Sequence, residues 1–70
     1  MAVQQVTYKT ITTRLYSAEE HEMLNQRNTS HRFDDLKDLG NYAYLLISTV
    51  TYTTHDGTVM VDTLAQTETY

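Results

Sequence analysis

Residues 42–67, YAYLLISTVTYTTHDGTVMVDTLAQT, decide the fold of this 70-residue chain. Both halves of the stretch are rich in Val, Ile, Thr and Tyr, whose branched or aromatic side chains pack well on a pleated sheet. Asp56-Gly57 lies between the halves and suits a two-residue type I′ turn. The stretch therefore predicts a β-hairpin with strands over residues 42–54 and 58–67.

The two faces of this hairpin differ in composition. With Asp56-Gly57 as the loop, Tyr52 lies opposite Val61. The other face is polar near the turn and apolar at its far end. This apolar end is more surface than the two short helices expected in this chain (below) can cover. Exposed apolar patches of this kind often mark interfaces. The expected core face carries Tyr44, Leu46, Val50, Tyr52, Val59, Val61 and Ala65, and the apolar end of the other face carries Leu45, Ile47 and Leu64.

The chain before the hairpin begins with a further strand. Residues 3–16 are rich in Thr, Val, Ile and Tyr, which favours one strand. By simple alternation, Val6 and Tyr8 would lie on one face of this strand, whereas Ile11 and Leu15 would lie on the other. Either a bulge at Lys9-Thr10 shifts the register, or both faces of the strand are partly covered.

A helical segment in two pieces follows this strand. Residues 17–20 read Ser-Ala-Glu-Glu and match the Ser-x-x-Glu capping box, which predicts a helix over residues 18–26. The Asn-Thr-Ser triplet at residues 28–30 is expected to break it. Phe33, Leu36 and Leu39 then recur at spacings of three before Gly40, which predicts a short second helix with glycine at its C-terminus.

These elements predict an α+β domain of order β-α-β-β that spans residues 1–70. We expect a three-stranded, mostly antiparallel sheet with the helical segment packed on one face. At least two of the three strands must be edges, and neither edge is protected by Pro or by a run of Lys.

Composition excludes several classes of function. The net charge of −4 argues against direct nucleic-acid binding, which needs clustered Lys and Arg. The longest apolar run is strand-sized, so we expect no membrane span. The chain has no cysteine and its N-terminus does not read as a secretory signal, so we expect a cytoplasmic protein.

Residues 36–50, LKDLGNYAYLLISTV, resemble a group of short uncharacterised bacterial and phage proteins with a Leu-x-x-Leu-Gly-x-x-Gly-Trp-Glu-Leu-Val-Ser-Val consensus. Ala43 stands where that consensus has its second Gly, Tyr44 where it has Trp, and Leu45 where it has Glu. The resemblance implies a β-α-β-β fold and no activity, because that group has no assigned chemistry. Size and acidity are also similar to those of phage-encoded inhibitors of host proteins, and a phage-encoded protein of this kind is expected in the host cytoplasm. The consensus is matched loosely at Leu36, Leu39, Gly40, Leu46 or Ile47, Ser48 and Val50.

Histidine and carboxylate residues are the candidates for chemistry. His21 and His31 would approach each other if the two helical pieces folded back, with Glu22 or Asp34 nearby, and such ligands suit zinc. No closely spaced His pair is present, so we expect no metal and no other cofactor. His55-Asp56 has the composition of a base with its orienting acid, but the turn already explains the Asp. We expect no enzyme, and a small enzyme using this pair is the weakest alternative.

The leading functional prediction is a non-enzymatic binding module, of the kind of a phage inhibitor, that binds a host protein. Its expected contacts are an acidic surface and tyrosines, because tyrosine is enriched at interfaces and carboxylates suit a basic groove. The alternative is an oligomeric nucleotide binder or sponge, in which Tyr rings stack on a base and Thr hydroxyls, Arg14 or Arg32 hold phosphate. The partner-binding candidates are Glu19, Glu20, Glu22, Asp34, Asp35, Asp38, Tyr8, Tyr16 and Tyr42.

A homo-oligomer, most simply a dimer, is the final prediction from the sequence. A chain of this size has a thin core, and without cysteine it has no disulfide to supplement it. A two-fold partner would cover the patch of Leu45, Ile47 and Leu64 or join edge strands into one sheet. The competing interpretation is a monomer that uses the same patch for a different protein.

Overall fold

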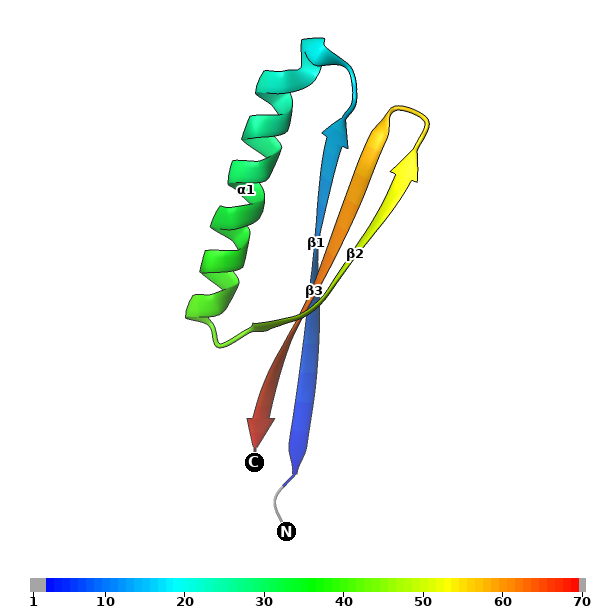
Figure 1. Cartoon of the computed structure of the whole chain (residues 1–70). Coiled ribbons are helices and arrows are strands. Elements are labelled where there is room, and N and C mark those ends of the chain that lie inside the picture. The colour runs from blue at the N-terminus through cyan, green and yellow to red at the C-terminus, as the bar shows by residue number, and fades with distance from the viewer. Residues whose placement is uncertain (1–2, 70) are drawn as a thin grey trace.

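The computed structural model describes residues 3–69 and has the element order β-α-β-β (Figure 1). Its three strands form one sheet in the order β1-β3-β2, with both neighbouring pairs antiparallel. The predicted α+β class is therefore confirmed. The elements are β1 over Gln4–Tyr16, a 3-10 turn η1 over Glu19–His21, α1 over Glu22–Asn41, β2 over Leu45–Thr54, and β3 over Gly57–Thr69.

The β2–β3 hairpin turns one residue earlier than its sequence predicts. Thr54 pairs with Gly57, so His55-Asp56 form the loop, and Tyr52 pairs with Val59 instead of Val61. Glycine is needed at position 57 for a different reason than the turn. A Cβ there would overlap the carbonyl oxygen of Leu15 in β1, because the backbones of β1 and β3 approach closely at this point.

The sheet has its irregularity in β2 and not in β1. Pairing of β1 with β3 runs without interruption from Gln4 opposite Thr69 to Tyr16 opposite Gly57, so the bulge considered near Lys9 is absent. The register instead shifts between Leu46 and Ser48, which leaves Ile47 as the extra residue.

α1 is one continuous helix, and the prediction of a break at residues 28–30 is wrong. Asn28 lies within the helix, and its side chain extends to β1, where it donates to the Arg14 carbonyl at 2.9 Å instead of bonding to the helix backbone. The predicted capping box is also absent. Ser17 Oγ donates to the Asp56 carbonyl in the hairpin turn at 3.2 Å, and no side chain caps either η1 or α1 at its N-terminus.

The C-terminus of α1 ends in a Schellman motif with alanine at the left-handed position. The Ala43 N–H donates to the Gly40 carbonyl and the Tyr44 N–H to the Leu39 carbonyl, both at 3.0 Å. Ala43 has φ of 64°, a conformation that favours glycine. Gly40 was expected to end the helix but lies inside it, three residues before the position that needs glycine.

The helix covers the face of the sheet opposite to the one the sequence favours. Ile11, Tyr44 and Leu64 form the buried cluster, with Leu36 and Leu39 of α1 packed against it. Leu64 is 1% exposed, so it belongs to the core of the chain and offers no interface surface, contrary to the prediction. Ile11 of β1 lies on this covered face, where it pairs directly with Asp62 of β3.

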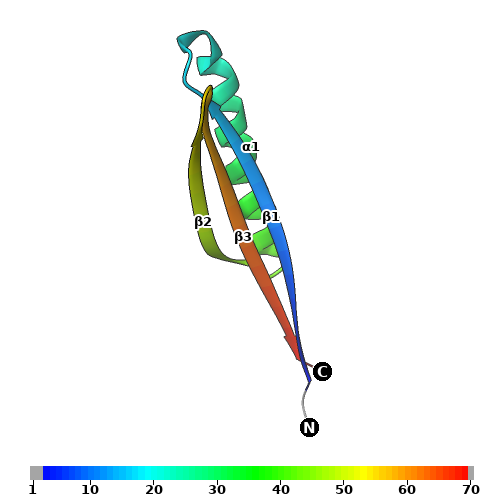
Figure 2. The ribbon, with the colours of Figure 1, turned by 90° about the vertical axis from the view of Figure 1, so that its right-hand side faces the viewer.

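The molecule is long and thin, with extents of 56 × 22 × 10 Å. α1 runs along β1 and leaves most of β2 uncovered (Figures 1 and 2). The paired ends of β1 and β3 extend as a two-stranded ribbon beyond the end of α1, and Gln4 lies opposite Thr69 at the tip of this ribbon.

Candidate functional site

The seam between α1 and β1 is held mainly by polar side chains. The Asn25 side chain pairs with both backbone groups of Tyr16, accepting from its N–H and donating to its carbonyl, each at 2.7 Å. Asn28 adds its bond to Arg14 two residues earlier on the same strand. Because no residue of α1 is buried, these amides do much of the docking that apolar residues perform in most amphipathic helices.

A buried ion pair joins the middle of α1 to the central strand. Arg32 Nε donates to Asp62 Oδ2 at 2.7 Å, and Arg32 Nη2 donates to Asp62 Oδ1 at 2.9 Å. Thr49 Oγ1 of β2 donates to the same Oδ1 at 2.7 Å. Asp62 has no exposed surface, so its charge is compensated entirely by these partners.

This arrangement fixes the charge state of both groups. The Arg32 hydrogen bonds lower the pKa of Asp62 below its ordinary value, and the Thr49 hydrogen bond acts in the same direction against the cost of burial. The Asp62 carboxylate in turn raises the pKa of Arg32. The pair is thus ionised across the neutral range, and it is a structural link between helix and sheet.

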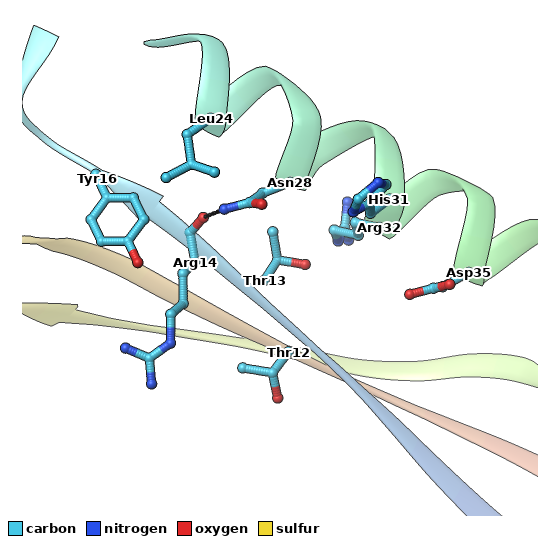
Figure 3. A pocket seen from close by; sticks show the side chains of 9 residues that line it. All are labelled: Thr12, Thr13, Arg14, Tyr16, Leu24, Asn28, His31, Arg32 and Asp35. Atoms are coloured by element: carbon cyan, nitrogen blue, oxygen red, sulfur yellow. Dashed lines mark hydrogen bonds between the residues drawn. The ribbon is translucent and has the colours of Figure 1, made fainter. Parts of the chain in front are cut away.

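A groove of about 520 Å³ lies between α1 and β1, and Arg32 of this ion pair is one of its lining residues (Figure 3). Leu24, Asn28 and His31 reach into it from the helix, whereas Thr13 points toward the helix from β1. Tyr16 closes one end, where its ring lies 5.1 Å from that of His21. The lining is completed by Thr12, Arg14, Arg32 and Asp35.

The groove can bind a small polar ligand but has weak charge selectivity. Arg32 is neutralised by Asp62, and Asp35 opposes the one remaining guanidinium, that of Arg14. Figure 3 shows the Arg14 side chain directed away from α1, so its charge lies at the rim of the groove. Hydroxyls of threonine and tyrosine supply most of the other donors.

A smaller hollow of about 320 Å³ lies at the other end of the helix. Lys9 Nζ sits 5.6 Å from the centre of the Tyr44 ring, within cation–π range. Gln66 closes the hollow by donating to the Tyr42 carbonyl at 2.5 Å. These contacts fasten the loop after α1 to the sheet.

The second face of the sheet, which we call the open face, has no helix packed on it and is nearly free of charge, although Val59 at its centre is only 4% exposed. Val59, Val61 and Ala65 of β3 form its centre, flanked by side chains of β1 and β2 that share their parity. Arg14 is its one charged residue among residues 4–69. Its large exposed apolar residues are Val6 (44% exposed), Tyr8 (62%), Leu45 (71%), Val50 (56%) and Tyr52 (51%). Val50 and Tyr52 were expected in the core and lie here instead.

The residues predicted to bind a partner fall in separate places. All six acids lie on η1 or α1 and are exposed. Tyr8 is on the open face, Tyr16 is half-buried in the groove, and Tyr42 follows the helix, 70% exposed. Sequence reasoning therefore names real surface residues but groups residues that the fold does not bring together.

The predicted interface patch is divided as well. Leu45 and Ile47 are exposed in β2, 71% and 57%, whereas Leu64 is internal. The β-bulge at Ile47 shifts the alternation of faces along β2, so positions before and after it do not share a face as simple alternation predicts. The sequence pattern does not reveal this shift.

The histidines do not assemble a reactive centre in the described part of the chain. The His21 ring is tilted by 49° against that of Tyr16, and its Nε2 lies 3.8 Å from Glu20 Oε1, while His31 is exposed on α1. Over residues 3–69, no three His, Cys, Asp or Glu side chains are placed to hold a metal ion. Asp56 accepts from Thr54 Oγ1 at 2.8 Å, which lowers its pKa and ties it to the turn.

Comparison with protein-family models, with curated proteins and with solved structures finds no match. Among residues 3–69, no helix has the length and apolar character needed to cross a membrane.

Sequence reasoning missed Asp62 and both helix-docking asparagines. Asp62 stands between Val61 and Thr63 in a strand, where aspartate is uncommon, and this was the signal for a buried partner. Asn25 and Asn28 carry no such signal, because asparagine on a helix surface is ordinary.

Proposed function

We propose that this protein is a non-enzymatic binding module that docks a protein partner on its open face. The proposal rests on five large apolar side chains that lie exposed on one face of the sheet, where only one residue is charged. Surfaces of this kind, rimmed by polar residues, favour protein partners over small ions. An inhibitor of the phage type is the form of such a module that the sequence likeness favours.

The acidic residues of η1 and α1 support this proposal because they would steer the protein toward a partner, while the open face makes the main contact. Their carboxylates lie on the helix side, away from the open face, and would steer the protein toward a basic partner at low salt. Binding by the open face should persist at about 0.5 M salt, where exposed charge interactions are largely screened.

The test compares matched variants in capture from a bacterial lysate. Val50→Lys places a charge on the open face, and we expect it to abolish recovery of a stoichiometric partner. Asp34→Lys changes charge on exposed helix surface and should leave recovery at high salt unchanged. Equal loss with both variants, or recovery only at low salt, would favour the acidic helix as the binding site. No stoichiometric partner with the unmodified chain would count against protein binding.

A phosphate-bearing nucleotide in the groove of Figure 3 is the second candidate function. The fold gathers Thr12, Thr13, Arg14, Tyr16 and Arg32 around one hollow, and these are the residue types that such a ligand needs. Thermal shift against a nucleotide panel tests it. Ligand at a hundred times its dissociation constant should stabilise the chain by about 2.7 kcal/mol, and Arg14→Gln should remove that shift.

A further inference from the structure

β2 is exposed on both faces and along its outer edge. Nine of its ten residues are exposed, and only Thr54 is half-buried. No Asp, Glu, Lys or Arg occurs between residues 39 and 55, although such residues make up 20% of the chain. The exposed large apolar residues of this strand are Leu45, Leu46, Ile47, Val50 and Tyr52.

The two edge strands of the sheet differ in whether side chains bond to their outer backbone groups. The outer edge of β1 is covered near Arg14 and Tyr16, where Asn25 and Asn28 bond to its backbone. Within residues 3–69, no side chain is seen to bond to the outer backbone of β2. Exposed edges are usually blocked because they pair with other strands, so an unblocked, uncharged edge points to a strand that completes it.

The hydrogen-bond pattern identifies the backbone groups on that edge. In an antiparallel sheet the N–H and C=O of one residue point to the same side, and the side alternates along the strand. Tyr16 bonds outward to Asn25, so its partner Gly57 directs its own groups to Thr54 of β2. By alternation, the N–H and C=O groups of Thr49, Thr51 and Thr53 point away from β3.

The exposed surface of the single chain has the size that a dimer would remove. A compact monomer of 8.1 kDa exposes roughly 4,500 Å². This chain exposes 5373 Å², which is roughly 900 Å² more than that. A standard protein interface buries about 800 Å² on each partner, which is close in size to this excess.

We propose that β2 pairs antiparallel with β2 of a second copy, through the outward groups of Thr49, Thr51 and Thr53. The result is a six-stranded sheet in the order β1-β3-β2-β2-β3-β1. Antiparallel pairing of identical strands is two-fold symmetric and closes after two copies. A second copy fits this edge because the strand carries no charge, so its pairing with the same strand of another copy places no like charges opposite each other.

This dimer stands on the edge of β2 and does not depend on the proposed function. If both hold, it joins two open faces into one continuous surface and doubles the area offered to a partner. A mass measurement needs no partner, so failure of the dimer and failure of partner binding are separate results.

Amide hydrogen exchange tests the pairing on the unmodified chain. In a monomer the Thr51 and Thr53 amides face solvent and should exchange at rates near those of an unfolded peptide. In the dimer we expect them to be slowed by on the order of 100-fold, and to lose this protection on dilution. The Tyr52 amide bonds to β3 in either case and serves as the internal control.

Mass in solution and matched variants complete the test. At about 100 µM we expect light scattering to give twice 8.1 kDa. Thr51→Pro removes an outward donor that the monomer does not use, so it should return the mass to 8.1 kDa and raise the dissociation constant more than tenfold. Thr51→Val keeps the branched strand residue and the amide, so it should remain dimeric.

Because the chain has no cysteine, Thr51→Cys and Thr53→Cys offer a second route should the proline variant unfold. Oxidation is expected to link two copies through at least one of these positions, and Thr12→Cys in β1 should not link them. A monomer at about 100 µM would overturn the proposal. So would a dimer whose Thr51 and Thr53 amides exchange freely, since that result assigns the contact to the open face.

Discussion

Asp62 is the residue on which the docking of helix to sheet depends most. It is the only fully buried charged residue among residues 3–69, and it accepts three hydrogen bonds from α1 and β2. The sequence indicates a special role for this residue only because aspartate is uncommon inside a strand. The partner was not readable, because Arg32 lies thirty residues earlier in a helix expected to be broken before it.

Asp62→Asn is expected to destabilise the fold by about 3 kcal/mol, because it leaves the Arg32 guanidinium partly buried without a counter-charge. A domain this small has little stability in reserve, so much of the chain should unfold. Urea unfolding followed by circular dichroism measures the change. Asp34→Asn, at an exposed helix position, is the control and should change stability by less than about 0.5 kcal/mol. A change of that small size in Asp62→Asn would show that the ion pair contributes little.

The same carboxylate makes stability depend on acid. Its pKa in the folded chain is lowered, so the folded state binds fewer protons than the unfolded state in this range. The stabilisation is complete above the unfolded value of about 3.9 and is lost as pH falls through the lower folded value. We expect the urea midpoint to be flat from about pH 7 to pH 5 and to fall below about pH 4. In Asp62→Asn that fall should be shallower.

The helix is anchored as an element by amides at one end and by leucines at the other. Sequence periodicity predicted the leucine end, since Leu36 and Leu39 do pack on the core. It failed at the amide end because helix-breaking tendencies of Asn, Thr and Ser are weak and tertiary bonds outweigh them. The edge of β1 supplies those bonds, and edge positions cannot be derived from local sequence.

Asn25→Ala tests the amide end of the helix. It removes both bonds to Tyr16, so we expect a loss of about 1–2 kcal/mol even though alanine is the better helix former. Gln26→Ala changes an exposed neighbour and should be neutral or slightly stabilising. Equal unfolding midpoints for the two variants would contradict the docking role of Asn25.

The C-terminal end of α1 offers a stabilising change. Ala43 occupies a left-handed conformation at φ 64°, so Ala43→Gly should raise the free energy of unfolding by about 1 kcal/mol. Gly40→Ala should add a similar amount, because nothing lies within 4 Å of the new Cβ and the position is helical. Thermal unfolding of both single variants checks this. A lower midpoint for Ala43→Gly would show that the alanine methyl packs favourably despite its backbone.

At the scale of the whole molecule, alternation predicted the strands but not which face the helix would cover. Val50, Tyr52, Val59 and Val61 form the more apolar face by sequence, yet the helix packs over Ile11, Asp62 and Leu64. In β1, Ile11 and Leu15 lie on the covered face, and their positions in the sequence were the signal for it. The more apolar face of the sheet is therefore left without a helix.

The charge distribution predicts how salt affects self-association. Two chains of charge −4 repel at low ionic strength, while the strands proposed to pair carry no charge. Raising salt from about 10 mM to about 1 M should therefore strengthen the dimer, because the Debye length shrinks from about 30 Å to about 3 Å. Sedimentation across that range measures the effect. A dimer that dissociates as salt rises would indicate an interface built on ion pairs.

The pairing of Gln4 with Thr69 brings the beginning and the end of the described chain to one pole of a 56 Å body. A polypeptide that enters and leaves at the same point can be spliced into a surface loop of a carrier protein without stretching either one. The ribbon would then act as a stalk, holding the helix and the free strand away from the carrier. The molecule is thus suited to being displayed as an inserted cassette, with its uncovered surfaces facing outward.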